Sequence, residues 1–362
     1  MPFCNVGTYQ NDVDAANNNG IQIFYRTYGC GPVKVLLIIG LAGTHDSWGP
    51  QIKGLAGTVT PNDDESLRTN IMAKDAIAVM DHLGWVKAHV FGHSMGAMIA
   101  CKLAALAPDR VSSLALLNVT GGGYECIPKL DCQTLAIAIR FLRAKTPEQR
   151  AAVDLDTHYS KEYLEEYVGL KTRRTILYKE YVKNISATGL QSSYGFEGQK
   201  NACWTHKMSR KELDSICAAG FPILVIHGRH DIIARLCHAK RLTEKLYPSA
   251  RMVELQGGHL VSHERTKEVN DSLLELIKES ESAITLNDWT NLPKKSTGCK
   301  ATGISFCKAE YERRSCFSFM VDIVKKLRTF LLYFFGLFDL AFEHIRGALR
   351  NIKLVRVEPI LR

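Results

Sequence analysis

Residues 89–105 read HVFGHSMGAMIACKLAA, and they place Ser94 between Gly92 and Gly96. An apolar run precedes this serine, and apolar residues at helical spacing follow it. Glycine weakens both strands and helices, so two glycines at a strand-to-helix junction need a geometric reason. We infer a turn so tight that the strand and helix backbones nearly touch. Such a turn, the nucleophile elbow, strains the serine and points its Oγ out of the sheet.

Apolar runs that alternate with helical patterns surround this junction. Strands are predicted at 21–29, 34–40, 113–119, 221–228 and 250–255, those at 34–40 and 113–119 buried, with a short strand leading into Ser94. A helix is predicted at 70–85, and Pro108 ends the helix that follows Ser94. Alternating strands and helices indicate βαβ units, so the predicted fold class is α/β, with a mostly parallel sheet and helices on both faces.

The alternating pattern is interrupted by a tyrosine-rich, mostly helical stretch. We therefore predict five segments: a first part of the α/β core at 1–121, a helical cap at 122–219, a second part of the core at 220–280, a polar linker at 281–316 and an apolar, basic helical tail at 317–362.

The C-terminal tail has the character of an interfacial helix. Residues 281–362 hold 14 Lys and Arg against 8 Asp and Glu, a net +6 of the chain's +9. Residues 329–338 are uncharged but too few to span a bilayer. We predict peripheral contact of residues 317–350 with an anionic membrane, and the alternative is a helix that packs on the main body. The small net charge of the main body argues against a nucleic-acid partner.

The composition is that of a globular protein, with 46% hydrophobic and 23% charged residues. The 11 cysteines are an odd number without CxxC pairs, which argues against a disulfide framework and a zinc ribbon. The start of the chain has no basic region followed by an apolar one, so a secretory signal peptide is not predicted. We expect a cytoplasmic protein with mostly buried thiols, Cys101 among them.

A serine nucleophile needs a base, and the base needs an orienting acid. Asp231 follows the strand at 221–228 and His259 follows the strand at 250–255, so both fall at the sheet edge where Ser94 lies. His263 is the rival base, and His230 ranks lower because it adjoins the acid. A metal site of His227, His230, His259 and His263 is a weaker alternative, because the serine needs no metal. No cofactor is expected.

Two backbone N–H groups are expected to stabilise the negative charge that develops on a substrate oxygen. Met95 follows the serine at a helix N-terminus, where N–H groups lack helical partners. Leu41 lies in the loop after the strand at 34–40, and Gly40 and Gly43 give this loop conformational freedom. His93 is interpreted as a space-filling residue.

Four blocks in this order resemble the α/β-hydrolase superfamily, in particular a plant-type branch: IIGLAGTHDSWGPQI, FGHSMGAMIACKLAALAPDRV, VIHGRHD and GGHLVSHERT. The resemblance covers residues 3–280. It implies an eight-stranded, mostly parallel sheet and a helical cap inserted after the strand at 113–119. The serine argues against epoxide hydrolases and haloalkane dehalogenases, which use an aspartate at this position.

Residues 53–75, KGLAGTVTPNDDESLRTNIMAKD, depart from the family. The resemblance implies a buried strand here, between the strands that match 21–29 and 34–40, but this chain has no apolar run to form it. We expect either that the strand at 21–29 shifts to pair with 34–40 or that the sheet has a gap. A gap would impair activity.

These residues predict a serine hydrolase that cleaves a small or medium ester, lactone or acyl substrate through an acyl-enzyme. Ser94 attacks the carbonyl carbon, His259 takes its proton, and Asp231 orients His259. Tyr159, Tyr163 and Tyr167 are expected to share one helix face of the cap, mostly as packing and in part as lining of an apolar pocket over Ser94. The alternative is a ligand receptor or pseudoenzyme with this fold and little or no turnover.

Overall fold

The computed structural model describes residues 3–6, 21–43, 45–55, 59–60, 69–129, 131–188, 193–282 and 286–291. All of them lie within Met1–Pro293, one of the two compact units of the chain. The predicted tail at 317–362 lies outside the described residues, so its membrane contact stays a prediction. Within the described ranges, every helix is too short or too polar to cross a bilayer.

A six-stranded sheet forms the centre of the described structure, in the order β10-β9-β6-β5-β3-β4. Its strands are β3 (Val33–Ile38), β4 (Val59–Thr60), β5 (Ala88–His93), β6 (Val111–Leu117), β9 (Ile223–Gly228) and β10 (Ala250–Leu255). Every pairing in this sheet is parallel. The predicted α/β class is therefore confirmed, although the described residues supply six strands to this sheet where the resemblance implied eight.

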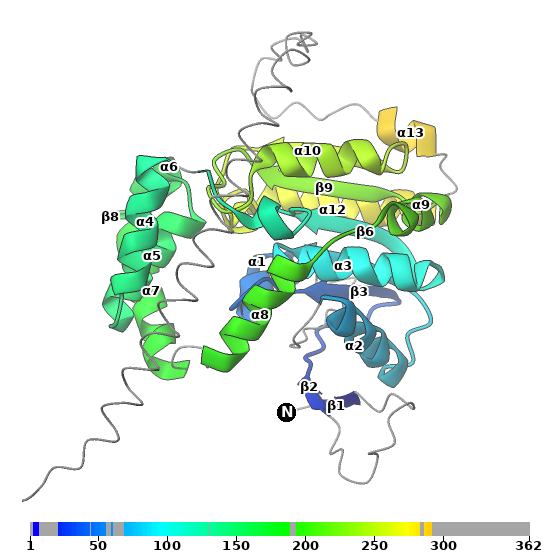
Figure 1. Cartoon of the computed structure of the whole chain (residues 1–362), viewed down its shortest axis with the longest axis horizontal. Helices are drawn as coiled ribbons and strands as arrows, with labels where there is room; N and C mark the ends of the chain where they lie inside the picture. The colour runs from blue at the N-terminus through cyan, green and yellow to red at the C-terminus, as the bar shows by residue number, and fades with distance from the viewer. Residues whose placement is uncertain are drawn as a thin grey trace, which may run out of the picture. The chain divides into compact units, whose positions relative to one another are not determined.

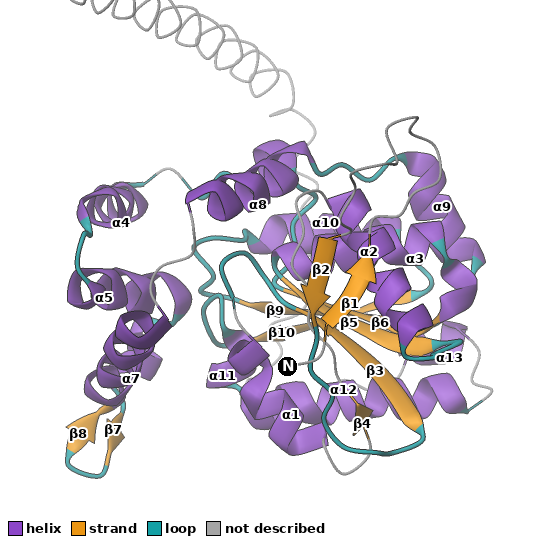
Figure 2. Ribbon diagram, turned by 90° about the horizontal axis from the view of Figure 1, so that it is seen from below, coloured by secondary structure: helices purple, strands orange, loops and turns teal. Residues whose placement is uncertain are grey.

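Helices cover both faces of the sheet, as Figures 1 and 2 show. One face packs against α2 (Thr69–His82), α3 (Met95–Leu106), α9 (Arg210–Ala218) and α10 (Leu236–Lys245). The other face packs against α1 (Gly49–Leu55), α11 (Val261–Glu264) and α12 (Thr266–Glu281). Successive side chains of β3 alternate between the two cores, because neighbouring residues of a strand point to opposite faces. Burial on both faces explains the continuous apolar runs of these strands.

The edge of the sheet beside β3 differs from the expectation for residues 21–29. β2 (Ile21–Phe24) does not pair with β3; it forms an antiparallel pair with β1 (Phe3–Val6). Among the described residues, β4 lies beside β3 and pairs with it at Val33 and Lys34. Of the two alternatives, the shift of the 21–29 strand is therefore wrong, and the described residues supply a two-residue strand where the resemblance implied a buried one.

A helical insertion separates β6 from α9 and β9; we use this name for α4 to α8. It comprises α4 (Cys132–Arg143), α5 (Pro147–His158), α6 (Lys161–Glu165), α7 (Arg173–Thr188) and α8 (Ser193–Thr205), with a small antiparallel pair of β7 (Tyr167–Val168) and β8 (Lys171–Thr172). The last helix of the predicted cap, α9, packs instead in the core cluster with α3. The division into core and cap stays a prediction.

The expectation that Tyr159, Tyr163 and Tyr167 share one helix face is wrong. Tyr159 is the extended residue that follows α5, and the side chain of Ser160 caps a new helix by accepting from the N–H of Tyr163. Tyr167 lies in β7 and is exposed. Tyr159 and Tyr163 nevertheless stack, with ring centroids 5.6 Å apart, so these two tyrosines serve packing.

Two further expectations need correction. The predicted linker at 281–316 begins with a helix, α13 (Leu286–Asn291), whose Trp289 is fully buried and donates its indole N–H to Ile223 O at 3.2 Å.

Of the cysteines that the structure describes, only Cys4 and Cys101 are buried, and Cys30, Cys132 and Cys237 are exposed. Cys101 is a core residue as predicted, but the expectation of mostly buried thiols is wrong.

Candidate active site

Ser94 lies in the strained turn between β5 and α3. Its φ is 55° and its ψ is −118°, a conformation that L-residues adopt only where the surrounding structure enforces it. The glycines on either side are sterically required. A Cβ atom at Gly92 would lie 2.3 Å from Gly96 O, and a Cβ at Gly96 would lie 2.1 Å from Ile38 O. The predicted close approach of strand and helix backbones is therefore confirmed.

The loop after β3 lies directly beside Ser94. A Cβ atom at Gly40 would come within 3.1 Å of the Ser94 Cβ. Leu41 follows in this loop and packs partly buried against the core. Met95 is the first residue of α3, so its N–H has no helical carbonyl to bind. The structure thus brings the peptide groups of Leu41 and Met95 into the neighbourhood of Ser94.

The helical insertion holds the loop after β3 in place. Ala42 has a φ of 56°, and its N–H donates to Gln199 Oε1 at 2.9 Å. Gln199 is a buried residue of α8. One backbone donor of the loop therefore bonds to α8, and the role of the neighbouring Leu41 N–H stays a prediction.

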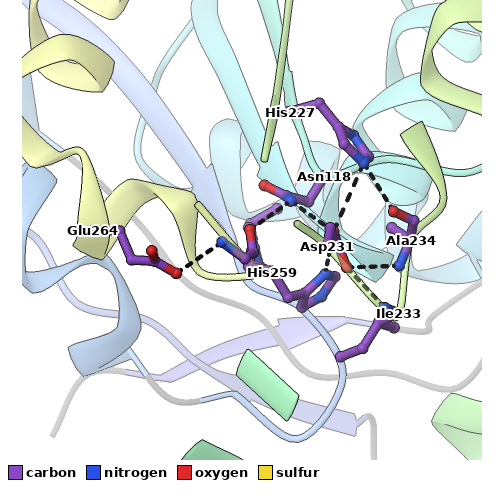
Figure 3. A network of polar contacts seen from close by, with 9 residues as sticks. Asn118, His227, Asp231, Ile233, Ala234, His259 and Glu264 are labelled. Carbon is purple, nitrogen blue, oxygen red and sulfur yellow. Dashed lines mark hydrogen bonds and ion pairs between the residues drawn. The ribbon is translucent and has the colours of Figure 1, made fainter. Parts of the chain in front are cut away.

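Asp231 and His259 meet at the carboxyl edge of the sheet, as Figure 3 shows. Asp231 follows β9 and His259 follows β10, and Asp231 Oδ2 lies 2.8 Å from His259 Nδ1. The same oxygen accepts from Asn118 Nδ2 at 2.7 Å. The other carboxylate oxygen accepts from the N–H groups of Ile233 and Ala234 at 2.8 and 2.9 Å.

The buried carboxyl group of Asp231 is held in its ionised form. Burial by itself raises the pKa of this group, but the His259 charge and hydrogen bond, helped by His227 and Asn118, lower the pKa to about 2. An ionised carboxylate only accepts, so the Nδ1 atom of His259 carries a proton and donates it. In a neutral His259 ring, Nε2 is then free to act as a proton acceptor.

His93 joins the Ser94 turn to the His259 loop. Its Nε2 lies 2.9 Å from His259 O, and the two ring centroids are 4.9 Å apart. Burial, followed by the nearby His259, lowers the pKa of His93 to about 3, so the ring is neutral and donates Nε2–H to the carbonyl oxygen. His93 thus does more than fill space. Among the hydrogen bonds of the described residues, none directly joins Ser94 to His259.

The rival histidines are engaged elsewhere. His263 Nδ1 lies 3.2 Å from the Tyr159 hydroxyl and its Nε2 lies 2.7 Å from Ser47 O, so both ring nitrogens have partners. His230 Nε2 lies 2.8 Å from Gln256 Oε1. His227 Nε2 lies 2.8 Å from Ala234 O. Across the described part of the chain, no group of three or more His, Cys, Asp or Glu side chains could hold a metal ion.

Sequence reasoning missed several residues that contact Asp231, His259 or the neighbouring loops: Asn118, Gln199, His158 and Glu264. Asn118 carried a readable signal, since it is a polar residue directly after the buried run of β6 and adopts a φ of 50°, which Asn tolerates better than most residues. The other three have no local signature. Their contacts can be recognised only in the folded structure, where the insertion packs against the core.

Ser94 lines neither of two cavities in the described part of the chain. A cavity of about 380 Å³ lies at Thr69, Lys102, His206 and Glu212. A larger one of about 700 Å³ lies between the insertion and α11–α12, with Ser160, Tyr163, His263 and Glu264 in its wall. The expected apolar pocket over Ser94 stays a prediction.

Residues 34–266 match the sequence profile of the alpha/beta hydrolase fold family. This range includes β3, the Ser94 turn, Asp231 and His259. The chain belongs to the α/β-hydrolase fold family.

Comparisons with individual proteins agree with this family. The chain is 25% identical over 269 residues to the dihydrolipoyllysine-residue acetyltransferase component of the acetoin cleaving system of Pseudomonas putida, which covers 71% of this chain and 66% of that protein. It is 30% identical over 118 residues to epoxide hydrolase 3 of Siraitia grosvenorii, covering 28% of this chain and 37% of that protein. The chain thus spans less than two thirds of the length of these curated relatives.

Solved structures show the same fold. The enol-lactonase from Burkholderia xenovorans LB400 superimposes with a TM-score of 0.57 at 22% identity, covering 72% of this chain and 98% of that one. A thermophilic esterase from Thermogutta terrifontis gives a TM-score of 0.55 at 19% identity, covering 74% of this chain and 97% of that one. At these identities the likeness concerns the fold alone.

Proposed function

We propose that this chain is a serine hydrolase that cleaves small or medium esters, lactones or other acyl substrates. One observation carries the proposal: the buried Asp231–His259 pair lies 2.8 Å apart in the loops after β9 and β10, and the His259 carbonyl is bonded to His93, the residue before the strained Ser94. A strained serine next to a histidine that is oriented by a carboxylate is the arrangement that activates a hydroxyl nucleophile.

In the proposed reaction, His259 Nε2 takes the Ser94 hydroxyl proton as Oγ bonds to the substrate carbonyl carbon. The carbonyl oxygen becomes an oxyanion, which the N–H groups of Leu41 and Met95 stabilise. His259 then gives its proton to the leaving group, the carbon–leaving-group bond breaks, and an acyl-enzyme remains on Ser94. A water molecule, deprotonated by His259, attacks this ester, and the acid product leaves as the proton returns to Ser94.

The relatives support an acyl substrate without defining it. The enol-lactonase and the esterase share the fold. The epoxide hydrolase shares sequence over 37% of its length. Because the nucleophile position here is a serine, attack at a carbonyl carbon suits this chain better than opening an epoxide.

The test is the hydrolysis of p-nitrophenyl acetate, p-nitrophenyl butyrate and a simple lactone by the full chain and by Ser94→Ala. We expect turnover by the wild type and a loss of about 10³-fold or more in Ser94→Ala with an unchanged melting temperature. Residual activity within a few-fold of the wild type would refute the assignment. If the wild type turns over none of these substrates but melts at a higher temperature with a small acyl ligand, a ligand receptor with this fold is the better description.

A further inference from the structure

The loop that carries His259 is fastened to the helical insertion as well as to the core. The N–H of Leu260 donates to His158 O at 2.9 Å. The His158 ring stacks on the His259 ring, with centroids 6.4 Å apart and an angle of 28° between the planes. The C-terminal end of α5 therefore packs against the His259 ring and its loop.

Backbones meet directly at this junction. A Cβ atom at Gly258 would lie 2.8 Å from His158 O and 3.0 Å from Ser160 N. Because the two backbones lie so close, their buried N–H groups need hydrogen-bond acceptors at this contact. The carboxylate of Glu264 is the acceptor for the N–H groups of Gly258 and Ser160.

Glu264 bonds to both sides of the junction. Its Oε1 accepts from the N–H of Gly258 at 2.7 Å and from the N–H of Ser160 at 2.8 Å. Its Oε2 accepts from the Ser160 hydroxyl at 2.5 Å. Figure 3 shows Glu264 reaching the backbone beside His259. Hydrogen bonds to a charged acceptor are shorter and stronger than those between neutral groups, so this one side chain binds both segments firmly.

We propose that Glu264 is a positioning residue for His259. It fixes the Gly257–Gly258 peptide group, one residue before His259, and ties it to Ser160 of the insertion, so the placement of the base depends on how the insertion is docked. This inference rests on the proposed role of His259. Glu264 itself touches neither Ser94 nor the reacting atoms; it acts through the Gly258–His259 backbone.

The variants Glu264→Ala and Glu264→Gln separate positioning from simple packing. In Glu264→Gln, the amide oxygen still accepts from the two N–H groups, and the amide nitrogen can donate to the Ser160 hydroxyl. Glu264→Ala loses all three bonds. The matched control is Glu268→Ala, because Glu268 is the next glutamate along the chain, lies in the first turn of α12 and pairs with Arg265.

We expect Glu264→Ala to lower kcat for p-nitrophenyl butyrate by about 10- to 100-fold, the scale of a small misplacement of a catalytic group, with KM changed by less than about twofold. Glu264→Gln should retain most of the activity, and Glu268→Ala should equal the wild type. In the same proteins, hydrogen–deuterium exchange should be faster at the amide of Gly258 in Glu264→Ala alone.

Unchanged kcat together with unchanged exchange at Gly258 in Glu264→Ala would overturn the inference, and so would a lower melting temperature with unchanged kcat. If Glu264→Ala does not fold, Glu264→Asp keeps the charge but shortens its reach, and the same criteria apply. If the wild type hydrolyses no ester, the proposed function fails. The exchange rate at Gly258 then still decides whether Glu264 fixes the loop.

Discussion

Asp231 Oδ2 lies 2.8 Å from His259 Nδ1, and the same oxygen receives a second hydrogen bond from Asn118. The carboxylate is fully buried and accepts four hydrogen bonds in all from Asn118, His259, Ile233 and Ala234. Such a carboxylate is fixed in orientation, and it therefore fixes the tautomer and direction of the His259 ring.

Asp231→Asn should lower kcat/KM by about 10⁴-fold, because an amide in place of the carboxylate favours the wrong His259 tautomer. Ester hydrolysis and melting temperature are measured on the same preparation. Asp214→Asn, at an exposed residue of α9, is the control and should behave as the wild type. A loss of less than tenfold in Asp231→Asn would mean that another group orients the base.

Gly96→Ala should destabilise the protein by about 1–3 kcal/mol or more, because the added Cβ would overlap the carbonyl of Ile38 in the tightly packed elbow. Gly49→Ala is the matched control, since a Cβ there meets nothing within 4 Å. Urea unfolding gives both values. Equal midpoints for the two variants would show that the strand and helix can separate without loss.

Gln199→Ala should lower kcat by about tenfold or more by releasing the Ala42 N–H and loosening the loop that carries Leu41. Gln149→Ala serves as the control, because Gln149 of α5 also accepts from a backbone N–H, that of Lys145, but this bond is exposed and local to the insertion. Substrate hydrolysis at saturation is the readout. Identical kcat values would exclude a role for the insertion in holding this loop.

Acidification should weaken folding because of buried neutral histidines. Burial lowers the pKa of His93 and His158 from 6.5 to about 3 in the folded chain. Below pH 6.5 the unfolded chain therefore binds protons that the folded chain does not. The stability that the neutral forms of His93 and His158 contribute is complete above pH 6.5. The free energy of unfolding then falls as the pH falls toward about 3, by up to about 1.4 kcal/mol per pH unit for each histidine.

Asp231 adds to this loss only at lower pH, between 3.8 and about 2, because its pKa is also lowered by folding.

Urea unfolding between about pH 7 and about pH 5 measures the slope of the unfolding free energy for the wild type and His158→Gln. We expect a smaller slope in the variant, by about one proton. The same slope in both proteins would mean that His158 is already protonated in the folded chain.

The sheet, the Ser94 turn and the loops of Asp231 and His259 could be predicted because their signals are local. Apolar runs define the strands, and the carboxyl ends of parallel strands meet at one edge, so residues that follow β5, β9 and β10 converge. The strand beside β3 could be judged only in part. The acidic, polar sequence after residue 60 gave no sign of a strand, and it did not show that β4 would pair with β3 at two residues.

The contacts of the insertion could not be predicted from the sequence. Glu264 meets Ser160 across 104 positions of the chain, and Gln199 meets Ala42 across 157. No periodicity encodes such a pairing, because it depends on how a set of helices docks on the sheet. The break between Tyr159 and Tyr163 had a local cause, the capping side chain of Ser160, which the regular spacing of the tyrosines concealed.

The central claim is that Ser94 is a nucleophile activated by His259, and covalent labelling tests it most directly. The full chain is treated with a fluorophosphonate, and the labelled residue is identified by mass spectrometry of the intact protein and its peptides. The account predicts one adduct per chain, on Ser94, that forms at least about 10³-fold more slowly in His259→Ala and is absent in Ser94→Ala. Labelling at another residue, or equally fast labelling of Ser94 in His259→Ala, would contradict it.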